Sequence, residues 1–174
     1  VYKRLSVRDN LAVSLVAQRR GYTFQCWQGW SKATTQDAMS WAERLGLASL
    51  AERPAGLLAY GDQKRLDIGL ALISKPQLLL LDEPMAGVTL QDRQSLMTLA
   101  RELLAEHSED AGILFTEHDM STVFQQAERI LVLDHGRIIA DGKPDDIARD
   151  ETVQRLYLGQ DHRLVTTSVS GGDQ

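Results

Sequence analysis

The first part of the chain has apolar residues at helical spacing, interrupted by one irregular stretch. The segments with this spacing are residues 6–20, 35–45 and 62–74. Ser6 and Asp9 resemble a capping box at the start of the first segment, and Gly46 is placed to end the second. Residues 21–34 carry tryptophans among glycines and polar residues without a clean period, which indicates an irregular insertion. Residues 1–58 are therefore predicted to be mostly helical.

From residue 76 onward, short apolar runs alternate with helical segments. The run of leucines at 78–81 is typical of a strand buried on both faces of a parallel sheet. Further strands are expected at 112–116, 130–133 and 137–140, and helices at 90–106, 119–127, 144–149 and 151–158. Because helices separate the strands up to residue 134, we predict right-handed crossovers and a parallel sheet, and hence an α/β fold. Asp119 is expected to cap its helix, and residues 134–136 to form a tight hairpin turn.

This pattern divides the chain into three parts. Residues 1–75 are predicted to form a helical subdomain, and residues 76–160 the α/β part. Residues 161–174, which are rich in Ser, Thr and Gly, are expected to be a flexible tail.

Length and composition limit the possible functions. A chain of 174 residues, 43% hydrophobic and 25% charged, is expected to be globular, with about one domain. Its net charge of -5 gives no general attraction to nucleic acid or anionic lipid, and its single cysteine, Cys26, excludes an internal disulfide framework. No apolar stretch is long enough to cross a bilayer, and the start does not resemble a signal peptide. Because the chain begins at Val1 and runs at once into patterned sequence, we expect an N-terminal portion of a longer protein to be absent.

The leucine run ends in two adjacent acids, Asp82 and Glu83, followed by Pro84. Parallel sheets bind ligands at the C-terminal ends of their strands, and a magnesium ion with a polyphosphate would compensate the cost of burying two charges there. In an extended backbone, adjacent side chains point to opposite sides, which suits two separate tasks. Asp82 is therefore expected to hold Mg²⁺, and Glu83 to position an attacking water or act as its base. Solvated acids at an ordinary strand end are the weaker alternative.

Two further segments are candidates for phosphate chemistry. Residues 58–62 precede a predicted helix, where small residues leave backbone amides free to bind phosphate. A plain loop with a glycine is an equal alternative for this segment. His118 follows the strand at 112–116 and is placed to bond a terminal phosphate or orient the water, although a lone histidine is more often structural.

In this order, the segments resemble the motifs of the ATP-binding subunits of ATP-binding cassette (ABC) transporters. The resemblance covers the chain from about residue 5 to residue 158. The corresponding motifs are the signature motif at Leu58, Ala59, Tyr60, Gly61 and Asp62, the Walker B strand ending in Asp82 and Glu83, the D-loop at Ala86, Gly87, Val88 and Thr89, and the switch histidine at His118. Within the family, the chain is most similar to the ATPases of branched-chain amino acid importers and their urea and amide relatives. Residues 157–164 also resemble the lipopolysaccharide-exporting ATPase.

The resemblance implies a P-loop NTPase core with a helical subdomain, of which residues 76–160 would be the C-terminal part. It implies a dimer that sandwiches ATP and Mg²⁺, in which residues 58–62 serve the partner's nucleotide while Asp82, Glu83 and His118 serve their own. The implied function is ATP hydrolysis that powers solute import. The implied partners are transmembrane permease subunits, a second ATPase subunit and, indirectly, a periplasmic solute-binding protein, but no nucleic acid. The implied location is peripheral, on the cytoplasmic face of the inner membrane.

Several positions depart from the family pattern. Ala59 occupies a position where the family has a serine, Asp62 one where it has a glutamine, and Thr89 one where it has an acid or asparagine. In addition, Gly69 destabilises its helix by roughly 1 kcal/mol relative to alanine. No Gly-rich loop ending in Gly-Lys-Ser or Gly-Lys-Thr occurs in the 174 residues. We therefore expect the chain to be a fragment that by itself neither holds ATP tightly nor hydrolyses it.

Functions outside transport remain alternatives. Cassette proteins that clamp nucleic acid or ribosomes usually have two cassettes, long coiled insertions or basic arms, none of which is seen in this acidic sequence. A non-catalytic interaction module is favoured slightly by Asp62 and Thr89. Within the transport class, lipopolysaccharide export is the alternative to import.

Overall fold

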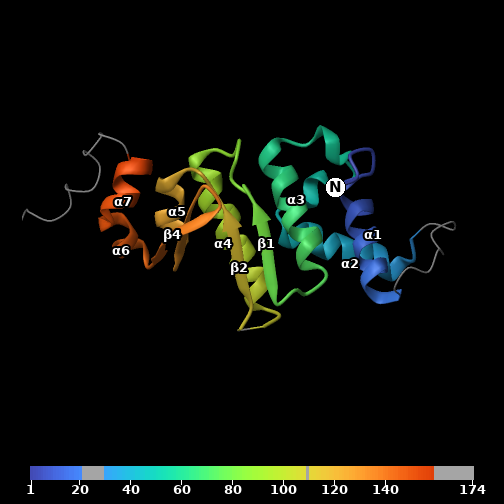
Figure 1. The fold of residues 1–174 in the computed structure, drawn as a ribbon. Helices are drawn as coiled ribbons and strands as arrows, with labels where there is room; N and C mark the ends of the chain where they lie inside the picture. The colour runs from blue at the N-terminus through green and yellow to red at the C-terminus, as the bar shows by residue number, and fades with distance from the viewer. Residues whose placement is uncertain (21–29, 109, 159–174) are drawn as a thin grey trace, which may run out of the picture. The chain divides into compact units, whose positions relative to one another are not determined.

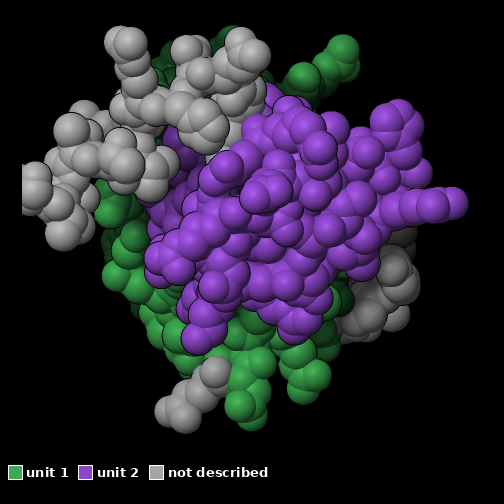
Figure 2. All heavy atoms as spheres, turned by 60° about the vertical axis from the view of Figure 1, so that its left-hand side comes forward, with its two compact units in different colours: residues 1–116 green, residues 117–174 purple. Residues whose placement is uncertain are grey.

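The computed structural model describes residues 1–20, 30–108 and 110–158. The chain divides into two compact units, Val1–Thr116 and Glu117–Gln174, which are coloured separately in Figure 2. The subdomain boundaries after residues 75 and 160 stay predictions, and the expected tail at 161–174 lies outside the described residues.

Unit 1 begins with α-helices, drawn in blue to green in Figure 1. They are α1 (Val7–Arg20), α2 (Lys32–Arg44) and α3 (Tyr60–Leu72), with 3₁₀ turns at Ala48–Leu50 and Ala55–Leu57 between α2 and α3. The Ser6 half of the predicted capping box is confirmed, because Ser6 Oγ accepts a hydrogen bond from the Asp9 amide at 3.0 Å. The second helix starts earlier than predicted because Ser31 caps it, accepting from the Thr34 amide at 3.1 Å. Gly46 follows α2 with φ +71°, as its predicted capping role requires.

Helix α3 approaches the end of α2 closely through Gly69. A Cβ on Gly69 would lie only 2.3 Å from Cδ1 of Leu45, which is itself buried. From the sequence alone, Gly69 is expected only to loosen the helix. Its absent side chain is instead what lets the two helices pack.

The sheet of unit 1 consists of β1 (Leu78–Asp82) and β2 (Gly112–Thr116), joined by α4 (Leu90–Ala105). The strands pair in parallel, in register from Leu78 opposite Gly112 to Asp82 opposite Thr116, which confirms the predicted parallel sheet. Leu79 belongs to a core that also contains Leu96 and Ala100 of α4. The other face is open, since Leu78 is 54%, Leu80 65% and Leu114 52% exposed. The prediction that both faces are buried is therefore wrong for the described residues, because the apolar side chains of α4 and the rest of the core meet one face only.

Unit 2 starts with α5 (Met120–Gln126) and ends with short helical segments. Between them, β3 (Ile130–Asp134) and β4 (Arg137–Gly142) form an antiparallel hairpin; α6 (Pro144–Arg149), α7 (Glu151–Val153) and a π-helical turn (Gln154–Leu158) follow. The predicted cap is confirmed, since the Asp119 carboxylate accepts from the amides of Ser121 and Thr122. The hairpin turn is also confirmed, with positive φ at His135 and Gly136. In the described residues β3 pairs only with β4, in antiparallel, so the predicted extension of the parallel sheet to β3 is not observed.

Part of the predicted insertion is tied to α1. The Trp30 indole packs against the core and donates to Oδ1 of Asp9 at 2.9 Å. Burial by itself raises the pKa of Asp9, but hydrogen bonds from Ser6 and Trp30 and the charge of Arg8 outweigh it, so the pKa lies below its usual value. Residues 21–29 of the insertion lie outside the described residues. None of the described helices has the length and apolar character needed to span a membrane.

Candidate functional site

The predicted carboxylates lie where β1 ends beside β2. Thr116, the last residue of β2, donates from its hydroxyl to Oδ1 of Asp82 at 2.6 Å. The amide of Glu83 donates to the main-chain oxygen and the hydroxyl of Thr116, at 3.1 Å and 3.2 Å. Both acids are exposed, so they are accessible to a ligand. The expectation that these two charges are buried therefore does not hold for the residues that the structure describes.

Glu83 does not continue the strand. Its φ of +42° places it in the left-handed region, which costs a non-glycine residue about 1–2 kcal/mol. The prediction that the two side chains diverge assumes an extended backbone, which Glu83 does not have. The left-handed turn redirects the chain immediately after Asp82, and such strained residues are concentrated at functional sites.

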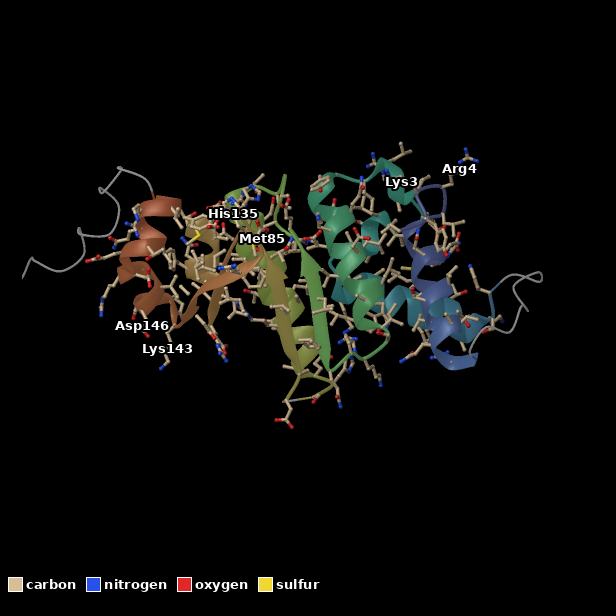
Figure 3. All side chains as sticks on the ribbon, in the orientation of Figure 1. Lys3, Arg4, Met85, His135, Lys143 and Asp146 are labelled. Atoms are coloured by element: carbon tan, nitrogen blue, oxygen red, sulfur yellow. The ribbon has the colours of Figure 1, made fainter. Side chains whose placement is uncertain are left out.

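The predicted D-loop forms a compact turn after Glu83. Met85, labelled in Figure 3, and Val88 are buried and anchor this turn, while Gly87 has φ +71°. Thr89 is the N-cap of α4, where it accepts from the Asp92 amide at 3.3 Å and donates to the Asp92 carboxylate at 2.6 Å. Thr89 departs from the acid or asparagine that the family resemblance leads one to expect, and its role in the structure is that of a helix cap.

The predicted signature segment forms the start of α3. Leu58 is buried below it, and Ala59 is the N-cap without a side-chain hydrogen bond to the first turn. A Cβ on Gly61 would meet no atom within 4 Å, so the surface here is open. Asp62 lies in the first turn, where a carboxylate is favourable to the helix dipole. The helix N-terminus therefore offers backbone amides to an anion, with Asp62 as a competing negative charge.

The structure groups most of the predicted residues in unit 1. Unit 1 contains the residues predicted for the signature (Leu58, Ala59, Tyr60, Gly61 and Asp62), for the Walker B end (Asp82 and Glu83) and for the D-loop (Ala86, Gly87, Val88 and Thr89). His118 belongs to unit 2, where it is exposed and directly precedes the helix cap Asp119. Its role at a terminal phosphate stays a prediction.

Two residues of the site were missed by the sequence analysis. Thr116 could have been found from the predicted strands, because it ends the strand parallel to β1 and therefore lies opposite Asp82 at the same edge of the sheet. Lys64, on α3, donates from Nζ to the main-chain oxygen of Glu83 at 3.2 Å. No sequence signal identifies this contact, because it joins a side chain to a backbone carbonyl on a distant segment.

The donor set is suited to a nucleotide with a divalent cation. Exposed carboxylate oxygens, such as those of Asp82, are ligands that Mg²⁺ accepts. Within the ranges that the structure describes, no group of three or more His, Cys, Asp or Glu could hold a metal by itself. Mg²⁺ usually keeps waters and phosphate oxygens among its ligands. A site with a single protein carboxylate therefore suits Mg²⁺ better than it suits a metal whose ligands all come from the protein.

An open groove of about 610 Å³ lies elsewhere in unit 1, away from the carboxylates. It is lined by the end of α2, by Arg65 of α3 and by one side of α4. Because Asp82, Glu83 and residues 58–62 do not line it, the groove is not part of the candidate site.

Two segments of the chain match models of protein families. Residues 1–86 match a model described as "ABC transporter", and residues 137–163 match one described as "Branched-chain amino acid ATP-binding cassette transporter".

Curated relatives match nearly the whole chain. The chain is 36% identical over 169 residues to the high-affinity branched-chain amino acid transport ATP-binding protein LivG of Escherichia coli K12, covering 92% of this chain and 64% of LivG. It is 34% identical to BraF of Pseudomonas aeruginosa, which carries the same description, with the same shares covered. The lipopolysaccharide export system ATP-binding protein LptB of E. coli K12 is 34% identical over 167 residues, with 94% of this chain and 64% of LptB covered. The chain thus spans about 64% of the length of these relatives.

Solved structures agree in fold. The ADP conformation of MJ1267, described as an ATP-binding cassette of an ABC transporter, matches with a TM-score of 0.73 and 27% identity, over 91% of this chain and 65% of that one. A nucleotide-free ATP-binding cassette from an ABC transporter matches with a TM-score of 0.72 and 25% identity, over 91% and 65%.

Proposed function

The chain belongs to the family of ABC transporter ATP-binding proteins, and from this premise we propose that it takes part in the ATP hydrolysis that powers solute import. The observation that carries the proposal is the Asp82–Glu83 pair, exposed at the end of β1 and fixed by Thr116. Transport of branched-chain amino acids, or of urea or amide compounds, is the solute class that we propose, supported by the likeness to LivG and BraF.

The proposed roles follow from what each group offers. ATP with Mg²⁺ would supply the phosphoryl group and the cation charge. Asp82 would bind the cation, and Glu83 would position the attacking water or accept its proton. The amides of Ala59 to Asp62 would hold phosphate oxygens of the nucleotide bound by a partner subunit, while His118 would serve the nucleotide of its own subunit. The predicted D-loop, Ala86 to Thr89, would lie between the two sites.

The proposed partners are those of an importer. They are transmembrane permease subunits, a second ATPase subunit of the same or a different kind and, indirectly, a periplasmic solute-binding protein. The proposed location is the cytoplasmic face of the inner membrane, with the protein attached peripherally through the permeases.

The test uses the full-length protein reconstituted with its membrane subunits. We expect ATP turnover that rises in the presence of leucine, isoleucine or valine with their binding protein. Replacing Glu83→Gln should lower turnover by about 10²-fold or more while ATP binding is kept, since general base catalysis contributes 10²–10⁴-fold. Glu102→Gln, on the exposed side of α4, is the matched control and should leave turnover unchanged. Undiminished hydrolysis by Glu83→Gln would defeat the catalytic role.

Lipopolysaccharide export is a second candidate, favoured by the match to LptB. The same reconstitution separates the two functions. If lipopolysaccharide stimulates turnover and amino acids do not, the function is lipopolysaccharide export and not solute import. The assignment of the chain to an ATPase would be unchanged by that result.

A further inference from the structure

Helix α3 contacts the loop after β1 at two points. At the first, Lys64 Nζ donates to the main-chain oxygen of Glu83 at 3.2 Å. At the second, a Cβ on Gly87 would lie 3.1 Å from Cε1 of Tyr60, so the tyrosine ring packs directly on the loop. The Lys64 ammonium also lies 5.5 Å from the centre of the Tyr60 ring, within cation–π range. One side of the loop is thus braced by the first turns of the helix that carries the predicted signature residues.

Both polar groups of the Glu83 backbone, the amide and the carbonyl, form hydrogen bonds. Its amide donates to Thr116, and its carbonyl accepts from the Ala86 amide at 3.3 Å and from Lys64. The Lys64 contact is charge-assisted and comes from a different segment of the chain, whereas the Ala86 contact lies within the loop itself. This matters because Glu83 is in the left-handed region, where a non-glycine residue stays only if its surroundings hold it.

We propose that Lys64 is a positioning residue that keeps Glu83 in its left-handed conformation and so links the orientation of its carboxylate to the signature helix. The chemical significance of this link rests on the proposed function, since it concerns the glutamate expected to act on water. A shift of the first turns of α3 is transmitted to Glu83 through the Lys64 contact and to Gly87 through Tyr60.

The first test is independent of catalysis and also uses the full-length protein. Amide hydrogen exchange is measured by NMR for Glu83, Ala86 and Val88, whose amides are all hydrogen-bonded within the site. Lys64→Met removes the donor but keeps the aliphatic stem, and we expect exchange at these amides to rise roughly tenfold, as for loss of a charge-assisted hydrogen bond. Lys64→Arg keeps a cationic donor and should restore slow exchange. Lys32→Met, at the exposed start of α2, is the matched control and should change nothing in the loop.

Two results would overturn the positioning role. One is unchanged exchange at Glu83, Ala86 and Val88 in Lys64→Met. The other is an equal rise at the buried amides of α4, which would mean that Lys64 supports global stability rather than this loop.

The second test uses the full-length protein. We expect Lys64→Met to lower kcat for ATP about tenfold with little change in KM, and Lys64→Arg to recover most of the loss, because the nucleotide contacts stay in place while the glutamate is misplaced. A rise in KM with kcat unchanged would contradict the proposal. If hydrolysis in the wild-type protein is insensitive to Glu83→Gln, the proposed function fails, and the exchange experiment still decides whether Lys64 positions the loop.

Discussion

The two units of this chain are stabilised in different ways. Unit 1 has a large apolar core that runs from α1 through α3 and Leu79 to α4. In the residues that the structure describes, unit 2 has a smaller core of Ile130, Val132, Ile147 and Val153, with helix caps at Asp119 and Asp150 and an ion pair between Arg129 and Asp141. We therefore expect unit 1 to be more sensitive than unit 2 to the loss of buried side-chain volume, whereas in unit 2 the contribution of helix caps and charges should be easier to detect.

The largest effect is expected inside the sheet of unit 1. Leu79 is 3% and its neighbour Leu80 65% exposed. Leu79→Ala should lower the free energy of unfolding by about 2–5 kcal/mol, because it removes buried methyl groups and leaves a cavity. Leu80→Ala, the matched control on the same strand, should change it by less than about 0.5 kcal/mol. Urea denaturation followed by tryptophan fluorescence reports unit 1 alone, since every tryptophan lies before residue 117. Equal losses for the two variants would show that the open face is packed in solution.

The next effect concerns the close approach at Gly69. Gly69→Ala should destabilise unit 1 by about 1–3 kcal/mol, because the added methyl group meets Leu45, even though alanine is the better helix former. The same change at Gly61, where the space is open, should be neutral or stabilise by up to about 1 kcal/mol. Both can be measured by urea denaturation. A stabilising Gly69→Ala would contradict the packing described between α3 and the end of α2.

In unit 2, the removal of a helix cap should have a smaller effect. Asp150 accepts from the amides of Thr152 and Val153 at 2.8 Å and 3.0 Å. Asp150→Ala should cost about 1 kcal/mol, seen as faster amide exchange in α7 and the β3–β4 hairpin. Asp145→Ala, at an exposed position in the first turn of α6, is the control and should cost a few tenths of a kcal/mol at most. Equal amide exchange rates in both variants would show that the Asp150 cap does not stabilise unit 2.

The smallest effect is a dependence on pH at the hairpin turn. The hydrogen bond to Asp134 and its charge raise the pKa of His135 above 6.5. Because the folded pKa is raised, the stabilisation is fully present below pH 6.5 and is lost as the pH rises through the folded pKa. An NMR titration should give a higher pKa for His135 than for the same ring in Asp134→Asn. Identical titration curves would show that the pair does not form in solution.

Much of the fold follows from the sequence because it depends on local pattern. Apolar periodicity predicted every helix and strand between residues 76 and 158, with the bounds of β2 and α6 as observed. The caps at Ser6 and Asp119 were predictable because their hydrogen bonds reach only a few residues along the chain.

The remaining features depend on contacts between distant segments. The exposed face of β1 could not be read from its leucines, because composition does not reveal which elements cover a strand. The left-handed Glu83 and its contact with Lys64 depend on a backbone turn and on a lysine 19 residues earlier in the chain. Likewise, Thr89 lies where family resemblance suggests a D-loop acid, whereas the structure shows a helix cap.

The open face of the β1–β2 sheet has a practical consequence for handling this chain. Leu78, Leu80 and Leu114 form an apolar surface, and in the described residues each of the two strands pairs with a single neighbour, leaving an unpaired edge. Flat apolar sheets with free edges are templates for aggregation. Preparations of the 174-residue chain are therefore expected to scatter light increasingly with concentration, and lysine substitutions at Leu80 and Leu114 to improve solubility.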